Sequence, residues 1–248
     1  MDKDIENFYV KFFLDLPIGA PGSEVSTRKA YSYIKNLPKK PKILDIGCFT
    51  GTKTIELAKF SKGEITAIDI IQPFLDKLKE NAKTSGVGEN VKALNKSMFS
   101  MDFNIESFDV IWCNSAVYNY GFEKALIDWR KFLKKGGYLV ISEAAWIKDN
   151  PPEVVCKFWE EEYPLMKSHE ENIDIIKNQE YELITSFSVE KEGLWKYYSP
   201  FEKKTAELIE TFCGNPVYLE LLESFQREVE IFKKYAEYYG FIFYVMQN

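Results

Sequence analysis

Two hydrophobic periods alternate along the middle of the chain. Short apolar segments flanked by charged or turn-forming residues predict strands, and segments with an apolar residue every three or four positions predict helices. The expected strands cover residues 42–46, 64–69, 91–95, 108–113 and 138–142, and the expected helices cover about 52–60, 73–84 and 122–133. Strands that alternate with helices in this way indicate an α/β fold with a parallel sheet between two helical layers.

The pattern is different at both ends of the chain. The first 40 residues predict two helices, about Ile5–Leu16 and from Ser26-Thr27 to about Leu37, separated by a loop rich in proline and glycine. After residue 151 the sequence predicts helices at about 152–180 and 200–239. Between and after them lie two further expected strands, Leu183–Val189 and Phe241–Met246, the last of which is free to run antiparallel.

No linker divides the chain into independent units. We therefore expect one domain over residues 1–248, made of an N-terminal helical segment (1–40), a core (41–150) and a C-terminal cap with the final strands (151–248).

Charge and cysteine content disfavour several classes of protein. The chain has 32 Lys and Arg against 38 Asp and Glu, a net charge of -6. Without a basic tract, nucleic-acid binding through the phosphate backbone is not expected. The four cysteines are widely spaced and form no Cys-x-x-Cys pair, so we expect reduced thiols, a cytoplasmic location and no metal site. No apolar run is long enough to span a bilayer, so no membrane partner is expected.

The most informative motif follows the first expected strand. Asp45 precedes Gly47 and Gly51, a Gly-x-x-x-Gly turn that leads into a helix. Glycine lets the backbone turn sharply and approach a ligand, and the N-terminus of a helix favours negative charge. Asp69, at the end of the second strand, can accept hydrogen bonds from ribose hydroxyl groups. Together these residues predict a nucleotide-like ligand, although an ordinary strand–turn–helix junction with a surface aspartate has the same pattern.

Two phosphate-binding motifs resemble this segment and fit it less well. The dinucleotide fingerprint Gly-x-Gly-x-x-Gly requires glycine where Phe49 stands, because that glycine admits the pyrophosphate. The segment differs at one residue from the phosphate-binding loop of nucleoside triphosphatases, because Thr52 stands where that loop has its second glycine. That loop leaves Asp45 unexplained, and the fourth strand ends in Cys113 and Asn114 with no aspartate for a metal ion. Both kinds of nucleotide binding are therefore disfavoured.

Residues 42–143 resemble the core of the class I S-adenosylmethionine-dependent methyltransferases. The first motif of that family is similar to Leu44–Gly51, and its acidic second motif is similar to Ala67–Asp69. The later motifs resemble Ser97-Met98, Phe108–Ile111 and Leu133–Gly137. A small subgroup of uncharacterised bacterial members is similar over nearly the whole chain, through Gly19–Lys29, Tyr118–Phe122, Ser142–Trp146, Trp195–Tyr198 and Tyr239–Tyr244.

The resemblance implies a three-layer α-β-α Rossmann-like fold with a seven-stranded, mostly parallel sheet whose last strand is antiparallel. It implies S-adenosylmethionine as the cofactor and S-adenosylhomocysteine as the product, bound by the core. The aromatic residues Phe8, Tyr9, Phe12 and Phe13 have helical spacing, so the N-terminal helix either packs in the core or forms a lid that closes over the cleft. The implied cofactor-binding residues are Asp45, Gly47, Cys48, Phe49 and Gly51 in the turn, Asp69 at the ribose, Ile70, Ser97 and Met98 at the adenine, and Asn114 at the methionine end. Phe49 departs from the family, which usually has glycine there, so its ring either covers the cofactor or crowds the pocket.

Other residues are candidates for catalysis or for binding the methyl acceptor. Glu143, just after the fifth strand, is the first candidate for a general base or substrate anchor, with Tyr118 as a second catalytic candidate. Tyr118 and Trp146 could line an apolar acceptor site, and Arg28 could hold a carboxylate. Alternatively, Glu143 caps the following segment, the aromatic residues belong to the core and Arg28 is a surface cation. His169, the only histidine, is expected to be a solvated surface residue.

The resemblance and the composition together predict methyl transfer to a small molecule. The absence of a basic tract and of an added recognition module favours a small-molecule acceptor over a protein or an RNA. A protein that binds S-adenosylmethionine without catalysis remains an alternative, because of Phe49 and because no general base is obvious. The sequence does not indicate an oligomeric state.

Overall fold

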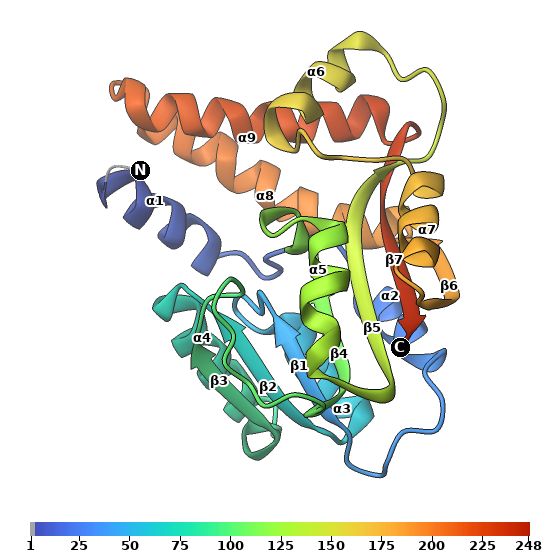
Figure 1. Cartoon of the computed structure of the whole chain (residues 1–248). Coiled ribbons are helices and arrows are strands. Elements are labelled where there is room, and N and C mark those ends of the chain that lie inside the picture. Colours follow the sequence, from blue (N-terminus) through green and yellow to red (C-terminus); the bar gives the residue numbers. More distant parts are fainter. Residues whose placement is uncertain (1–2) are drawn as a thin grey trace.

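The computed structural model describes residues 3–248, in which seven strands form one sheet (Figure 1). The strands are β1 (Lys42–Ile46), β2 (Glu64–Asp69), β3 (Val91–Asn95), β4 (Phe108–Asn114), β5 (Leu133–Trp146), β6 (Glu182–Ser188) and β7 (Tyr239–Gln247). Their order is β3-β2-β1-β4-β5-β7-β6; β7 is antiparallel to both neighbours, and the other paired strands are parallel. The predicted seven-stranded sheet with an antiparallel last strand is confirmed.

Helices cover both faces of the sheet. They are α1 (Lys3–Leu14), α2 (Glu24–Ser32), α3 (Thr52–Ser61), α4 (Gln72–Thr84), α5 (Phe122–Trp129), α6 (Glu153–Glu162), α7 (His169–Asn178), α8 (Lys191–Thr211) and α9 (Pro216–Tyr235). Successive side chains of a strand point to opposite faces. Ile43 of β1 therefore packs in the core with α2, α3 and α4, whereas Leu44 packs in a second core with α5 and α7. The α/β layering follows from this alternation.

β5 is more than twice as long as predicted. The helix expected to reach residue 133 ends at Trp129, and Leu133 already pairs with Phe108 of β4. The register shifts after that pair, and Gly136 has a φ of +71°, so the Lys-Lys-Gly-Gly segment is an irregularity within the strand and not a turn before it. At the other end the strand continues through Glu143 to Trp146, paired with β7. Glu143 therefore lies inside the sheet, and its expected position after the strand is wrong.

The second helix begins earlier and ends earlier than predicted. Ser23 caps it, because its hydroxyl accepts a hydrogen bond from the Ser26 amide at 3.0 Å while the Ser26 hydroxyl accepts one from the Ser23 amide. This capping box places the first helical residue at Glu24, and the helix ends at Ser32 and not near residue 37.

Helices from both ends of the chain meet over the carboxyl ends of the parallel strands. Figure 1 shows α1, α8 and α9 together on this side of the sheet, with α6 beside α9. The ring centroid of Phe12 in α1 lies 5.2 Å from that of Phe201 in α8 and 4.8 Å from that of Phe225 in α9. α1 is therefore packed into the cap. None of the helices within residues 3–248 is both long and apolar enough to cross a membrane.

Candidate functional site

A cavity of about 590 Å³ lies between the carboxyl ends of the strands and the helices above them. Its volume is within the range of about 300–1,000 Å³ that is typical of small-molecule sites. The strand side contributes Gly47, Asp69, Ser97 and Asn114. The other side, called the cap side below, is lined by Glu143 of β5 and by residues of α1, α6, α8 and α9. Ligands of open α/β sheets bind at this edge.

The turn after β1 needs both of its glycines. Gly47 has a φ of +72° and Gly51 a φ of +84°, a region that side chains rarely adopt. A Cβ on Gly47 would lie 2.6 Å from that of Ala116, and a Cβ on Gly51 would lie 1.9 Å from Cδ1 of Leu78 in α4. Gly51 caps α3 without lining the cavity, whereas Gly47 lines it, so a ligand can approach the backbone at Gly47.

Asp69 joins two loops at the mouth of the cavity. One oxygen of its carboxylate accepts a hydrogen bond from the Phe49 amide at 3.0 Å, and the other accepts one from the Ile71 amide at 3.0 Å. Burial raises the pKa of Asp69, and hydrogen bonds from backbone amides oppose the rise. Because each carboxylate oxygen has two acceptor sites, the group can still accept hydrogen bonds from a ligand in the cavity.

Asp45 lies beneath the turn and does not line the cavity. Its side chain is only 2% exposed and accepts a hydrogen bond of 2.6 Å from the Thr54 hydroxyl in α3. Burial raises the pKa of Asp45 to about 7, and the bond from Thr54 opposes this. These contacts hold the turn in place, and they do not fit the contact with the cofactor that the resemblance implies. Cys48 is also buried outside the cavity lining.

Three residues expected at an adenine do line the cavity. Ile70 is 64% exposed, and Ser97 and Met98 follow β3 on the same side. The Ser97 hydroxyl accepts a hydrogen bond from the Phe99 amide at 3.1 Å, which fixes this loop. Hydrophobic side chains next to a fixed polar loop suit a flat heteroaromatic ring.

Asn114 has an unpartnered oxygen at the end of β4. Its amide nitrogen donates to the Pro21 carbonyl at 3.1 Å, but the buried Oδ1 has no hydrogen-bond partner among residues 3–248. A buried acceptor without a partner is costly, so a donor on a bound ligand would stabilise this site. The observation fits the amino group of a bound amino acid, which supplies such a donor.

Glu143 and Tyr118 come together at the cavity. Glu143 is 2% exposed; its Oε1 accepts from the Ala144 amide at 2.7 Å, and its Oε2 has no partner among the described residues. Burial raises the pKa of Glu143 to about 8. The half-exposed Tyr118 ring lies edge-on to Tyr163, with centroids 6.0 Å apart. This arrangement provides an acceptor of protons beside an aromatic wall.

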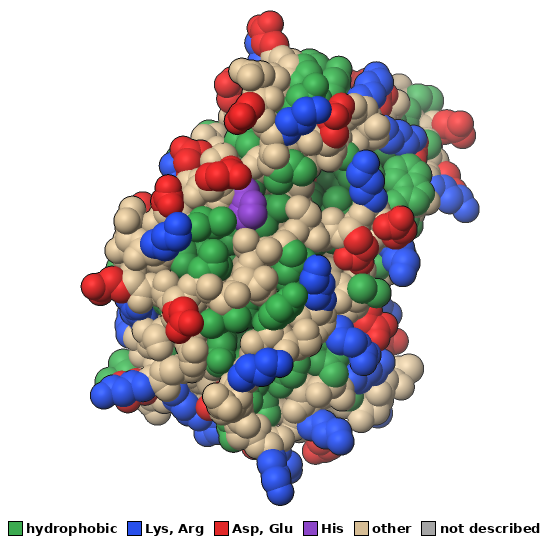
Figure 2. All heavy atoms as spheres, turned by 90° about the vertical axis from the view of Figure 1, so that its right-hand side faces the viewer, with side chains coloured by type: hydrophobic (Ala, Val, Ile, Leu, Met, Phe, Trp, Pro, Cys, Tyr) green, Lys and Arg blue, Asp and Glu red, His purple; other side chains and the backbone are tan. Residues whose placement is uncertain are grey.

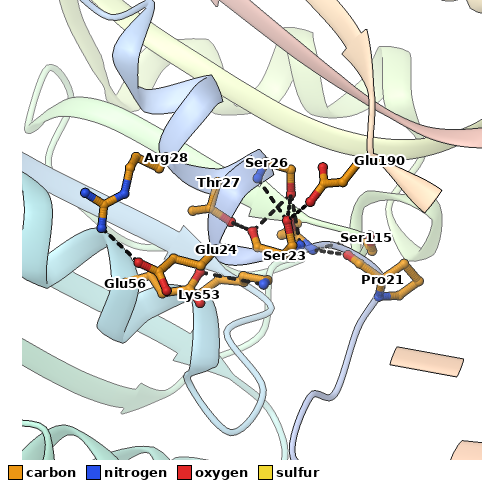
Figure 3. A network of polar contacts seen from close by, with 11 residues as sticks. Pro21, Ser23, Glu24, Ser26, Thr27, Arg28, Lys53, Glu56, Ser115 and Glu190 are labelled. Atoms are coloured by element: carbon orange, nitrogen blue, oxygen red, sulfur yellow. Dashed lines mark hydrogen bonds and ion pairs between the residues drawn. The ribbon is translucent and has the colours of Figure 1, made fainter. Parts of the chain in front are cut away.

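Arg28 and Trp146 lie outside the cavity, so the expectation that they bind the acceptor is wrong. Arg28 is on the exposed side of α2, paired with Glu24 at 2.8 Å (Figure 3). Trp146 is three residues after Glu143 on the same strand, which places it on the opposite face of the sheet. His169 is only partly exposed and shares a 2.8 Å hydrogen bond with Ser186, so it is not a free surface residue.

Phe49 supports the N-terminal helix. Its backbone has a φ of +53°, and its ring lies 4.0 Å from the Phe74 ring and 5.7 Å from the Phe13 ring of α1, measured between centroids. A Cβ on Gly19 would lie 1.9 Å from Cε1 of Phe49, so the chain that follows α1 crosses directly over this ring. Phe49 lines the cavity and at the same time connects the turn to α1.

Further cavity residues were not predicted as site residues from the sequence, among them Tyr9, Glu162, Tyr197 and Glu228. Glu228 had a detectable signal. It follows Leu221, Ser224 and Phe225 at helical spacing on one face of α9, and all four line the cavity. A carboxylate on the apolar face of an amphipathic helix is unusual and indicates a polar ligand or partner.

The sequence matches the model of one family of known proteins. The methyltransferase domain family matches residues 37–204, about two thirds of the chain. A sarcosine/dimethylglycine N-methyltransferase of Aphanothece halophytica is 24% identical over 125 residues, which are 50% of this chain and 45% of that protein. The chain spans less than half the length of the curated relatives it matches.

Two solved structures share the fold over nearly their whole length. YjhP of Escherichia coli superimposes with a TM-score of 0.82 at 19% identity, covering 95% of this chain and 96% of that one. A methyltransferase of Geobacter sulfurreducens in complex with S-adenosylhomocysteine gives a TM-score of 0.79 at 18% identity, covering 96% and 97%. By its sequence match and its fold, the chain belongs to the methyltransferase domain family, in the class I S-adenosylmethionine-dependent type.

Proposed function

We propose that this protein transfers a methyl group from S-adenosylmethionine to a small-molecule acceptor inside the cavity. The observation that carries the proposal is the position of Glu143, whose unpartnered carboxylate oxygen lies in the same cavity as the turn at Gly47 and the carboxylate of Asp69. Cofactor-binding and acceptor-binding groups therefore share one cavity. The cavity is covered by α1, α6, α8 and α9, which suits a small acceptor.

The residues of the cavity fit the cofactor. Asp69 would accept hydrogen bonds from the ribose hydroxyls, while Ile70, Ser97 and Met98 would contact the adenine. Gly47 admits the methionine part close to the backbone, and Asn114 would accept from its amino group. When bound, the cofactor supplies an electrophilic methyl group on a sulfonium.

The chain itself has three tasks in such a reaction: to bind the acceptor, to align it and to exclude water. The aromatic rings of the cap perform the last two. Glu143 serves as the proton acceptor, because burial raises its pKa to about 8 and a base is most effective near the working pH. Its neighbour Tyr118 lines the acceptor side.

A protein or RNA acceptor and a role without catalysis are less well supported. The net charge of -6 does not favour an RNA acceptor. On the face shown in Figure 2, Lys and Arg side chains predominate in the lower half, and most of the acidic side chains lie in the upper half. The ring of Phe49 packs against Phe74 and Phe13, so it forms part of the cavity wall. The proposed methyl transfer therefore does not require glycine in place of Phe49.

The proposal is tested with cofactor that carries a labelled methyl group. The protein is incubated with metabolite fractions, with protein and with RNA, and we expect label only in low-molecular-weight product. Glu143→Gln should keep its affinity for S-adenosylhomocysteine and lose most turnover, and the matched control Glu123→Gln, on the surface at the start of α5, should keep both. Label in protein or RNA alone, or wild-type turnover in Glu143→Gln, would contradict the proposal.

A further inference from the structure

The cap side of the cavity is acidic and aromatic. Three carboxyl groups line it: Glu143 from β5, Glu162 from α6 and Glu228 from α9. Aromatic rings lie between them, among them Tyr9 of α1 and Tyr197 of α8. Five elements thus place carboxyl and aromatic groups around one space.

Positive charge is confined to the other side of the cavity. Among the lining residues within 3–248, Lys96 is the one cation; it follows β3 and is paired with Asp102. The three glutamates of the cap side therefore have no lysine, arginine or histidine partner in the lining. An anionic acceptor such as a carboxylate or phosphate would find no cation to pair with there.

Glu143 shows that the cap side is built to receive a ligand. Its carboxyl group is 2% exposed, and Oε2 has no partner among the described residues although it is fully buried. Burial of an unpartnered carboxylate costs free energy that a bound donor would recover. Glu228 accepts a hydrogen bond from the Tyr198 hydroxyl at 3.0 Å, which holds its carboxyl group in place and leaves further acceptor sites.

The tyrosine and glutamate side chains are close enough to influence one another. Burial raises the pKa of Tyr118, and the negative charges of Glu143, Glu228 and Glu162 also raise it. Burial likewise raises the pKa of Glu228 to about 7, with a further contribution from the charge of Glu162. A cation among these groups would lower the pKa of each carboxyl group and would be attracted by the faces of the rings.

We propose that the methyl acceptor is an amine that enters the cap side as an ammonium ion and is held by Glu143, Glu162 and Glu228 among the tyrosine rings. This inference rests on the proposed function. The ammonium gives one proton to Oε2 of Glu143, and the nitrogen lone pair that is released forms the new N–C bond. The C–S bond breaks with its electron pair on sulfur, so the products are a methylated ammonium and S-adenosylhomocysteine.

Binding of an unreactive cation tests the inference without turnover. Choline and 3,3-dimethylbutan-1-ol have the same shape and differ in the charge on the central atom. On protein saturated with S-adenosylhomocysteine, we expect choline to bind at least about tenfold more tightly in calorimetric titration, since cation–π and carboxylate contacts add. Benzylamine should likewise bind more tightly than benzyl alcohol, and benzoate least of all.

A pair of variants on α9 assigns the effect to the cavity. Glu228→Gln should lower the preference for choline over its neutral isostere by about tenfold while the affinity for S-adenosylhomocysteine stays unchanged. Glu230→Gln is the matched control, because Glu230 is exposed on the same helix and does not line this cavity. In methyl-transfer assays the same Glu228→Gln change should raise KM for amines more than it lowers kcat.

The outcomes separate the two proposals. If S-adenosylhomocysteine binds but the neutral isosteres or benzoate bind as well as the cations, or no cation binds, the amine inference is wrong and the methyltransferase proposal stands. Methylation of phenols or carboxylates but not of amines would also contradict the amine inference and leave the methyltransferase proposal intact. If S-adenosylhomocysteine itself does not bind, the proposed function fails first.

Discussion

Replacing Asp69 by asparagine tests how the cavity binds the ribose. The carboxylate already accepts hydrogen bonds from the Phe49 and Ile71 amides, both at 3.0 Å. An asparagine keeps one acceptor oxygen and puts an NH₂ group opposite the other N–H donor. It removes the charge that strengthens hydrogen bonds from a ligand, each of which is worth about 1.5–3 kcal/mol when the acceptor is ionised.

The expected result is a weaker cofactor complex. At 1.4 kcal/mol per tenfold change, the dissociation constant of S-adenosylhomocysteine should rise about 10- to 100-fold in Asp69→Asn. Calorimetric titration of both proteins with S-adenosylhomocysteine and with its 2′,3′-dideoxy analogue forms a double-mutant cycle. Removal of the hydroxyls should weaken binding to the wild-type protein strongly and binding to the variant little, because the contact is already lost there.

The control is Asp76→Asn on the adjacent helix α4. The Asp76 side chain is 61% exposed and lies outside the cavity lining, so its loss should leave both affinities unchanged. If Asp69→Asn binds S-adenosylhomocysteine as the wild type does, or if the two changes weaken binding additively, Asp69 does not contact the ribose.

Three further substitutions test the general base Glu143, the turn after β1 and the packing of α1. Burial raises the pKa of Glu143 from an ordinary 4.5 to about 8, so the folded protein holds a proton that the unfolded chain releases. Stability should therefore fall as pH rises from about 5 to 8, and thermal unfolding of Glu143→Gln should show a smaller decrease. Thr54→Val removes the 2.6 Å hydrogen bond to buried Asp45 and should lower the free energy of unfolding in urea by about 1–3 kcal/mol. Phe49→Ala removes the ring beneath α1 and should cost about 2–4 kcal/mol and speed proteolysis within α1.

Each of these changes has a control or a contradicting result. Three tyrosines also face Glu143: Tyr118, Tyr163 and Tyr244. Burial raises the pKa of each, so they stay neutral between about pH 5 and 8 and do not contribute to the pH dependence of stability. If the stability of Glu143→Gln falls as steeply with pH as that of the wild type, another group causes the pH dependence, for instance Asp45, whose pKa is raised to about 7 by burial. Thr84→Val, exposed at the end of α4, should be near neutral. Unchanged proteolysis of Phe49→Ala would mean that α1 is held by other contacts.

The central strands β1 and β4 were predictable because they are buried on both faces, and such strands are continuous apolar segments. The bounds of β1, β2 and β3 agree with the prediction to the residue, although none of the residues of the edge strand β3 is fully buried. β5 was predicted too short because its segment of two lysines and two glycines has the composition of a turn. The residues before and after this segment pair with β4, and those after it also pair with β7, so the segment is part of one long strand. Pairing with distant segments is a property of the whole sheet and leaves no local signal.

The candidate site, too, was predictable in one part and not in the other. The residues near the turn come from one continuous stretch with a recognisable motif, and Gly47, Asp69, Ser97 and Met98 all line the cavity as expected. The cap side combines Tyr9, Glu162 and Glu228, which are more than 60 residues apart from one another in the sequence. The function of Phe49 depends on Gly19 above its ring, a contact that only the folded chain creates.

The most direct test of the central claim is calorimetric titration with S-adenosylhomocysteine, with ATP as the control ligand. The structure predicts one site with micromolar affinity for S-adenosylhomocysteine and no heat from ATP. Binding of ATP alone would mean that the segment from Gly47 to Thr54 is a phosphate-binding loop, and it would contradict the assignment of the cavity to S-adenosylmethionine.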